Sequence, residues 1–133
     1  VALLASSAVV AVALPAASLG LGYPFTPARQ LLDAGASVAI ATDWNPGSAP
    51  MGQLVASASI LAAAEKLTNA EVLAALTFRA AQALDLKDRG RLQTGFIADF
   101  IIYDTDNYQD ITYCQGRLQP QAVWKNGLEI YHQ

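Results

Sequence analysis

Charged residues are almost absent from the first half of this 133-residue chain. Only three of its nineteen charged residues precede position 65, namely Arg29, Asp33 and Asp43. Because charged side chains are rarely buried, a long stretch without them is typical of a protein core. A core-like half needs a second layer to cover it, and the remaining chain is short for that purpose. We therefore expect one modest domain that buries part of its first half against another segment.

Two short apolar runs within this half predict strands that are buried on both faces. Val9–Leu14 is rich in valine and ends at Pro15, and Ser37–Thr42 has the same apolar character. Continuous runs of this kind are typical of parallel sheets. Between them, Pro27–Ala34 favours a short helix with proline in its first turn and Gly35 directly after its end. The order strand, helix, strand predicts a right-handed parallel crossover and an α/β fold.

A loop is expected after the second strand, because two prolines and a glycine in Asp43–Pro50 prevent regular structure. Ligands bind at this edge in α/β folds. Asp43 directly follows the strand, so its carboxylate either ligates a metal or acts as a base, or it only caps the following turn. Position alone leaves both interpretations open. Nearby, Asn45 supplies a donor and an acceptor, Ser48 a hydroxyl, and Gly47 room for a ligand beside the backbone, although a rigid turn without a ligand is the alternative.

The second half predicts two helices followed by a small antiparallel sheet. The first helix is the alanine-rich segment Met51–Lys66, and the second begins at a capping box formed by Thr68–Glu71. The apolar residues of the second helix form one stripe at helical spacing: Val72, Leu73, Leu76, Ala80, Ala83 and Leu84. Further along, a strand at Phe100–Tyr103 and an Asn-Gly pair between two β-rich runs predict a hairpin. We therefore divide the chain into an α/β part, residues 1–89, and an antiparallel tail, residues 90–133.

Composition argues against several other classes of protein. The net charge is −3 and no basic run exists, so nucleic acid is not an expected partner. His132 is the only histidine and Cys114 the only cysteine, which disfavours a nucleophilic triad and excludes an internal disulfide. A single cysteine fits a reducing, cytoplasmic compartment. The apolar opening Val1–Gly22 has no basic residue before it and is interrupted by serines and Pro15, so we expect an internal strand there and no membrane span.

Several motifs resemble those of the amidohydrolase superfamily, in the same order and spacing from about Val9 to Tyr131. Val38–Pro50 looks like the signature that follows the last barrel strand of imidazolonepropionases, and its Asp-Trp-Asn-Pro-Gly-Ser core is the most specific motif. Leu67–Leu84 resembles the amidohydrolase helix that follows this loop. Gly90–Asp104 resembles the return into the β-sandwich of the family, and Lys125–Gly127 resembles its closing hairpin.

The resemblance implies an α/β chain that holds the last two strand-helix units of an amidohydrolase (β/α)8 barrel, followed by a small antiparallel β-sandwich portion. It also implies hydrolysis of 4-imidazolone-5-propanoate to N-formimidoyl-L-glutamate, in histidine degradation. By this similarity Asp43 would ligate zinc or iron and take the proton of the attacking water, whose pKa a bound metal lowers to about 7. Asn45 and Gly47 would hold the amino-acid end of the product, and Ser48 the substrate. Arg79 departs from the asparagine of many relatives, on a helix away from this loop.

The other metal ligands of the family are absent from this sequence. They are a His-x-His pair after the first barrel strand and a histidine of a middle strand, whereas His132 lies in the tail. A catalytic zinc generally has three protein ligands, and such a barrel takes about 250 residues. We therefore expect a fragment that is inactive on its own, and the missing methionine at position 1 favours the same interpretation. Because unpaired strand edges invite association, we expect a homo-oligomer or association with the missing N-terminal part. The alternatives are another cyclic-amide hydrolase or deaminase of the superfamily, and a non-catalytic α/β module.

Overall fold

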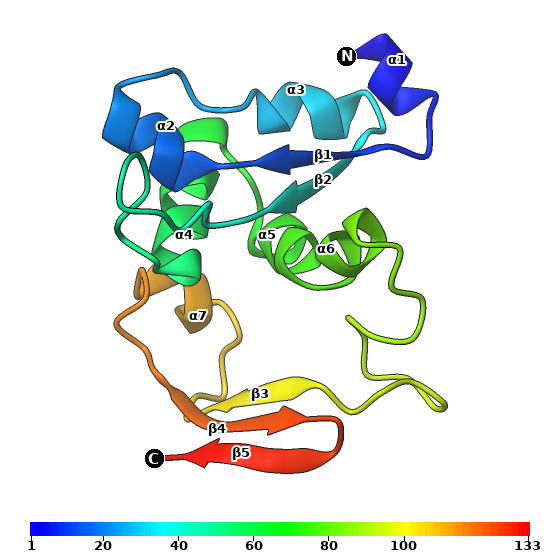
Figure 1. The fold of residues 1–133 in the computed structure, drawn as a ribbon, viewed down its shortest axis with the longest axis vertical. Helices are drawn as coiled ribbons and strands as arrows, with labels where there is room; N and C mark the ends of the chain where they lie inside the picture. The colour runs from blue at the N-terminus through cyan, green and yellow to red at the C-terminus, as the bar shows by residue number, and fades with distance from the viewer.

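The chain folds into an α/β part and an antiparallel β tail, with helices between the two sheets (Figure 1). The computed structural model describes all residues from Val1 to Gln133. In Figure 1, helix α3 (Ala28–Asp33) lies above a two-stranded sheet and helix α2 (Pro15–Leu21) lies at the arrowhead end of its strands. Helices α5 (Asn69–Leu76) and α6 (Phe78–Ala83) lie beneath this sheet, and a three-stranded sheet closes the other end. None of the helices has the length and apolar character that crossing a membrane requires.

The two-stranded sheet confirms both strands that the apolar runs predicted. Strand β1 (Val10–Ala13) pairs in parallel with strand β2 (Ser37–Ile40), with Val10 opposite Ser37. The last three residues of β2 are buried, whereas Val12 of β1 is 46% exposed. Because each strand has only one neighbour, each keeps one unpaired edge.

The connection between these strands holds one predicted helix and one that was not predicted. Helix α3 (Ala28–Asp33) confirms the expected crossover helix, and Gly35 follows its end with a φ of +89°. Helix α2 (Pro15–Leu21) begins directly after β1. Pro15 ends the strand as expected but also starts this helix, since the missing N–H of proline is not needed in a first turn. Gly22 ends α2 in the left-handed region, with a φ of +68°.

Helix α4 (Leu54–Glu65) confirms the first of the two helices expected after the Asp43–Pro50 loop. The predicted capping box that follows α4 is confirmed as well. Lys66 ends α4 in the left-handed region. Thr68 Oγ1 accepts the backbone N–H of Glu71 at 3.3 Å, and Glu71 Oε2 accepts the backbone N–H of Thr68 at 2.8 Å. A short helix at the start of the chain, α1 (Ala2–Ala5), was not predicted.

The single helix predicted after this capping box is in fact two helices. Helix α5 (Asn69–Leu76) ends at Thr77, whose φ and ψ of −120° and −98° are not helical, and helix α6 (Phe78–Ala83) starts after this break. The Thr77 hydroxyl donates to the carbonyl of Leu73 at 2.7 Å, a side-chain bond of the kind that competes with regular helix structure. As a result Leu84, which the stripe placed in the core, is 72% exposed.

The hydrophobic core lies between the parallel sheet and helices α3, α4 and α5. Most of its side chains are small, so the helices approach the strands closely. Its ten buried members are Ala13, Ala28, Leu31, Ala36, Val38, Ile40, Ala58, Leu61, Val72 and Ala75.

The tail forms the antiparallel sheet that the sequence predicted. Strands β3 (Phe100–Tyr103), β4 (Pro120–Lys125) and β5 (Leu128–His132) lie in that order. The turn Asn126–Gly127 has positive φ at both residues, as a tight hairpin with this pair requires. Between β3 and β4, the unpredicted short helix α7 (Asp110–Tyr113) leaves the sheet.

Helix α7 attaches the tail to the α/β part. The Ser59 hydroxyl of α4 donates to the carbonyl of Thr112 at 2.8 Å, and the Thr112 hydroxyl donates to Asn69 Oδ1 at 2.7 Å. Ser59 and Thr112 are both buried. The domain division at residues 89 and 90 stays a prediction.

Candidate functional site

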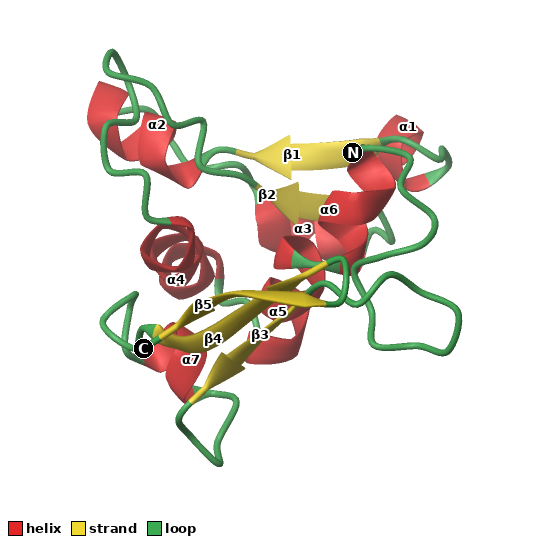
Figure 2. Cartoon of the chain, turned by 60° about the horizontal axis from the view of Figure 1, so that its bottom comes forward, coloured by secondary structure: helices red, strands yellow, loops and turns green.

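The loop Asp43–Pro50 lies at the carboxyl end of β2, where the sequence predicted a ligand-binding edge. Pairing of the two strands continues one step past β2, because the N–H of Ala41 donates to the carbonyl of Ala13 at 3.0 Å. Beyond that point the loop contains no regular element except one isolated bridge between Asn45 and Ala49. In Figure 2 both arrowheads of this sheet point toward α2, so the loop and α2 share the same end of the strands.

The carboxylate of Asp43 is exposed and makes no hydrogen bond and no ion pair within the chain. Its backbone has a φ of +51°, an uncommon conformation for a residue other than glycine. The side chain of Asn45 forms the cap of the following turn instead. The interpretation that Asp43 only caps this turn is therefore wrong, and its carboxylate is available to a ligand.

The side chain of Asn45 organises the whole loop. Its Oδ1 accepts the backbone N–H groups of Gly47 and Ser48, each at 2.9 Å. Its Nδ2 donates to the carbonyl of Asp43 and to the Ser48 hydroxyl, the latter at 3.1 Å. The structure thus brings together Asp43, Asn45, Gly47 and Ser48, the four residues that the sequence selected. The amide of Asn45, however, makes its hydrogen bonds within the loop.

Two glycines, Gly20 and Gly52, lie in close contact with residues of this loop. A Cβ built on Gly52 would lie 2.9 Å from the indole of Trp44, so the ring covers that glycine while remaining 75% exposed. Gly20 of α2 meets the backbone of Ser48 even more closely. Sequence reasoning missed Gly20, because α2 itself was not predicted. The sequence did contain one signal: Gly20 follows a predicted strand at a position where no turn is expected, which indicates a close approach of another segment.

The donor atoms of this chain do not form a metal site by themselves. No group of three or more His, Cys, Asp or Glu side chains lies close enough together to hold a metal ion. Asp43 fits one position in such a site, because its oxygens are unpaired and hard ligands suit divalent cations. His132 does not join it, since its Nδ1 lies 3.2 Å from Glu129 Oε1 in the exposed strand β5.

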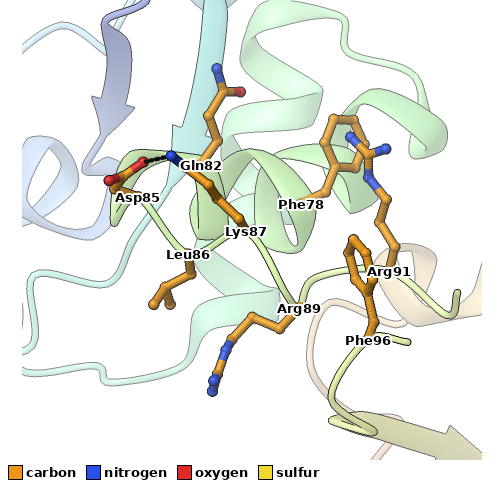
Figure 3. A pocket seen from close by; sticks show the side chains of 8 residues that line it. All are labelled: Phe78, Gln82, Asp85, Leu86, Lys87, Arg89, Arg91 and Phe96. Atoms are coloured by element: carbon orange, nitrogen blue, oxygen red, sulfur yellow. Dashed lines mark ion pairs between the residues drawn. The ribbon is translucent and has the colours of Figure 1, made fainter. Parts of the chain in front are cut away.

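Two hollows of the molecule lie away from this loop. Figure 3 shows a pocket of about 290 Å³ beside α6, where Arg91 lies over the Phe78 ring with its guanidinium carbon 4.7 Å from the ring centroid. Asp85 and Lys87 pair at its rim with a 3.5 Å separation. A larger apolar cavity of about 600 Å³ separates the helices from the sheet of the tail. Neither hollow is lined by a residue of the Asp43–Pro50 loop.

The pattern of a parallel strand pair, a carboxylate loop and an antiparallel tail agrees with a known family of hydrolases. The model of the amidohydrolase family matches residues 2–130, nearly the whole chain. The chain belongs to the amidohydrolase family.

Imidazolonepropionases are among the relatives that this chain resembles. The chain is 43% identical to the imidazolonepropionase of Deinococcus deserti over 130 residues, which cover 96% of this chain and 32% of that protein. It is 37% identical to the imidazolonepropionase of Fusobacterium nucleatum, again over 96% of this chain and 31% of the relative. The chain therefore spans about a third of the length of the curated relatives that it matches.

Solved structures give the same fold. An adenosine deaminase from Xanthomonas campestris with bound zinc superposes with a TM-score of 0.79 at 30% identity, over 93% of this chain and 32% of that one. Atrazine chlorohydrolase from Arthrobacter aurescens, complexed with zinc, superposes with a TM-score of 0.81 at 23% identity, over 96% of this chain and 32% of its own. The second likeness concerns the fold alone. Together they establish a mixed α/β chain of amidohydrolase fold.

Proposed function

We propose that this chain is the C-terminal part of an imidazolonepropionase, which hydrolyses 4-imidazolone-5-propanoate to N-formimidoyl-L-glutamate in histidine degradation. The observation that carries the proposal is the Asp-Trp-Asn-Pro-Gly-Ser loop at the carboxyl end of β2, where the Asp43 carboxylate has no partner within the chain. Relatives of that activity, 37–43% identical to this chain, support the choice of substrate.

In this proposal, β1 and β2 are the last two strands of a (β/α)8 barrel. Residues 1–89 form the C-terminal part of the barrel, and residues 90–133 form part of a β-sandwich. The parallel pairing of the strands and their unpaired edges support this assignment, since a closed barrel gives each strand two neighbours. The missing six strands agree in size with a chain that spans about a third of its relatives.

Asp43 is the residue to which we assign the chemistry. It would ligate a zinc or iron ion, whose role when bound is to lower the pKa of water to about 7. The Asp43 carboxylate would then accept a proton from the attacking water and pass it to the ring nitrogen as the C–N bond breaks. Asn45 and Gly47 would face the amino-acid end of the product, and Ser48 the substrate.

The proposal assigns the remaining ligands and strands to an upstream part of the protein. Zinc bound to two solved structures of the same fold supports a metal, while the choice between zinc and iron rests on the resemblance alone. The isolated chain should therefore bind metal weakly and hydrolyse nothing. We further propose that it associates with the upstream part or with copies of itself, takes a small-molecule substrate, and acts in the cytoplasm, where one unpaired cysteine is stable.

A deaminase is the second candidate function. The likeness to the Xanthomonas campestris adenosine deaminase, at 30% identity, favours it. Both candidates use a water molecule to displace nitrogen from a carbon atom, so the Asp43 carboxylate would serve either one. The identity of the substrate therefore separates the two candidates.

The experiment that tests the proposal is Asp43→Asn in a longer chain that includes the upstream part. We expect turnover of 4-imidazolone-5-propanoate to fall by about 10² to 10⁴-fold, with an unchanged circular dichroism spectrum. Asp85→Asn is the matched control, because it removes the same charge from an exposed carboxylate outside the loop. Retained turnover in Asp43→Asn would refute the catalytic assignment, and turnover of adenosine instead would select the deaminase.

A further inference from the structure

We propose that helix α2 positions the Asp43–Pro50 loop, and that Gly20 is the positioning residue which sets the distance between the two. The importance of this contact for catalysis rests on the proposed function of the loop. The contact itself is a feature of the fold and is independent of that function.

The contact is closer than any residue with a side chain permits. A Cβ on Gly20 would overlap the carbonyl oxygen of Ser48 and lie 3.2 Å from its carbonyl carbon. Both are backbone atoms, so no rotation of a side chain can relieve the conflict. A Cβ at this position would therefore force the loop and the helix apart by about 1 Å, which is the gap to an ordinary contact distance.

Backbone conformation does not account for glycine at this position. Gly20 lies inside α2 and has no positive φ, so an alanine could adopt the same backbone conformation and would favour the helix. Gly22 shows the contrast, since its φ of +68° favours glycine while a Cβ there would meet open space. The close approach to Ser48 is therefore the physical reason for glycine at position 20.

A displacement at Ser48 would reach Asp43, because the loop is tied into one unit. The side chain of Asn45 bonds both the backbone and the hydroxyl of Ser48, and its Nδ2 also bonds the carbonyl of Asp43. The N–H of Asn45 also donates to the carbonyl of Ala49 at 3.3 Å, which closes the same unit around Ser48.

Helix α2 is itself fixed to the sheet. It begins two residues after Ala13, the fully buried last residue of β1, and its first two residues, Pro15 and Ala16, are buried. Figure 1 shows α2 at the arrowhead end of both strands, next to the loop. Asp43 is thus fixed in two ways. The chain connects it directly to β2, and the contact of α2 with the loop fixes its position relative to β1.

The test inserts a methyl group and follows the loop by fluorescence. Trp44 reports on the loop, and Trp124→Phe removes the only other tryptophan. In that background we compare Gly20→Ala and Gly20→Ser with the control Ser18→Ala. The control also raises helix propensity within α2, and it removes a hydroxyl that makes no hydrogen bond. We expect both Gly20 variants to shift the emission maximum and the acrylamide quenching of Trp44, with circular dichroism unchanged, and Ser18→Ala to leave both signals as they are.

In a longer, active chain, Gly20→Ala should lower kcat/KM by on the order of 100-fold, mainly through kcat, since a misplacement of about 1 Å has that effect. Unchanged Trp44 signals in both Gly20 variants would overturn the inference, and so would global unfolding of the isolated variants, because the proposed role is local. If Trp44 responds but the longer chain never hydrolyses 4-imidazolone-5-propanoate, the positioning role stands and the proposed function fails.

Discussion

The contact between Arg29 and Glu71 offers the sharpest test of what stabilises the α/β part. Arg29 of α3 donates from Nη1 and Nη2 to the two carboxylate oxygens of Glu71 at 3.0 and 2.9 Å, which joins α3 to α5. Glu71 also completes the capping box of α5. Glu71→Gln keeps the shape and a capping acceptor but removes the charge, whereas Glu71→Ala removes both.

The magnitude follows from the pKa of Glu71. Its hydrogen bonds to Arg29, followed by that from the backbone of Thr68, lower this pKa from 4.5 to about 2. Without solvent screening, a pKa change of this size would contribute about 3 kcal/mol to the free energy of unfolding. The two side chains are 32% and 25% exposed, and solvent screens partly exposed pairs, so we expect about 1 kcal/mol for Glu71→Gln. Loss of the reciprocal cap adds about 1 kcal/mol in Glu71→Ala.

The sign of the pH dependence is fixed by the lowered pKa. A carboxylate with a lower pKa in the folded state stabilises the fold above the unfolded-state pKa, near 4.5, and loses this contribution as pH falls toward 2. The free energy of unfolding of the wild type should therefore exceed that of Glu71→Gln at pH 7, and the difference should disappear between pH 4.5 and 2.

Urea unfolding measures both effects. With a denaturant slope of about 2 kcal/mol/M, the midpoint should fall by about 0.5 M for Glu71→Gln and about 1 M for Glu71→Ala at pH 7. A double-mutant cycle with Arg29→Met should give a coupling of about 1 kcal/mol. Equal midpoints of wild type and Glu71→Gln at pH 7, or a difference that persists at pH 2, would refute the reasoning.

Three further predictions concern the tail. Gly127→Ala should destabilise the chain by about 1 kcal/mol, since Gly127 has a φ of +76°; an unchanged thermal midpoint would contradict this. Ser59→Ala should cost about 1 kcal/mol and loosen α7, because the carbonyl of Thr112 loses its 2.8 Å donor; hydrogen exchange at Thr112 should rise while that of β2 stays constant. Asp99→Asn should weaken the hairpin, because the N–H of Asn126 and the ammonium of Lys125 lower the pKa of Asp99; the wild-type hairpin should accordingly lose stability as pH falls through this lowered pKa, and a pH-independent hairpin signal would count against this pair.

The elements that the sequence predicted correctly are those with a local cause. Strand β2 follows from a continuous apolar run, the start of α5 follows from the capping box of Thr68 and Glu71, and the hairpin turn follows from Asn126–Gly127. In each case neighbouring residues supply the hydrogen bonds or the backbone freedom. The same holds for the loop at Asp43, because prolines act on their own neighbours.

The elements that the sequence missed depend on contacts between distant segments. The break at Thr77 separates α5 from α6, and α6 contacts both β1 and β2; an apolar stripe cannot reveal that break. Helix α7 exists beside α4, where Ser59 and Thr112 meet across 53 positions of sequence. Helix α2 is short, and its place depends on the burial of Pro15 and Ala16 and on the contact of Gly20 with the loop.

For the candidate site, the sequence by itself determined which residues stand at the end of a buried strand, because the order of residues and the stiffness of proline are local properties. It left open whether the carboxylate of Asp43 caps the turn or stays free for a ligand. Tertiary structure decided that question, because hydrogen bonds go to the groups that the folded backbone brings within about 3 Å. It also decided how close α2 lies to Ser48, since the distance between two segments is set by packing and not by either segment alone.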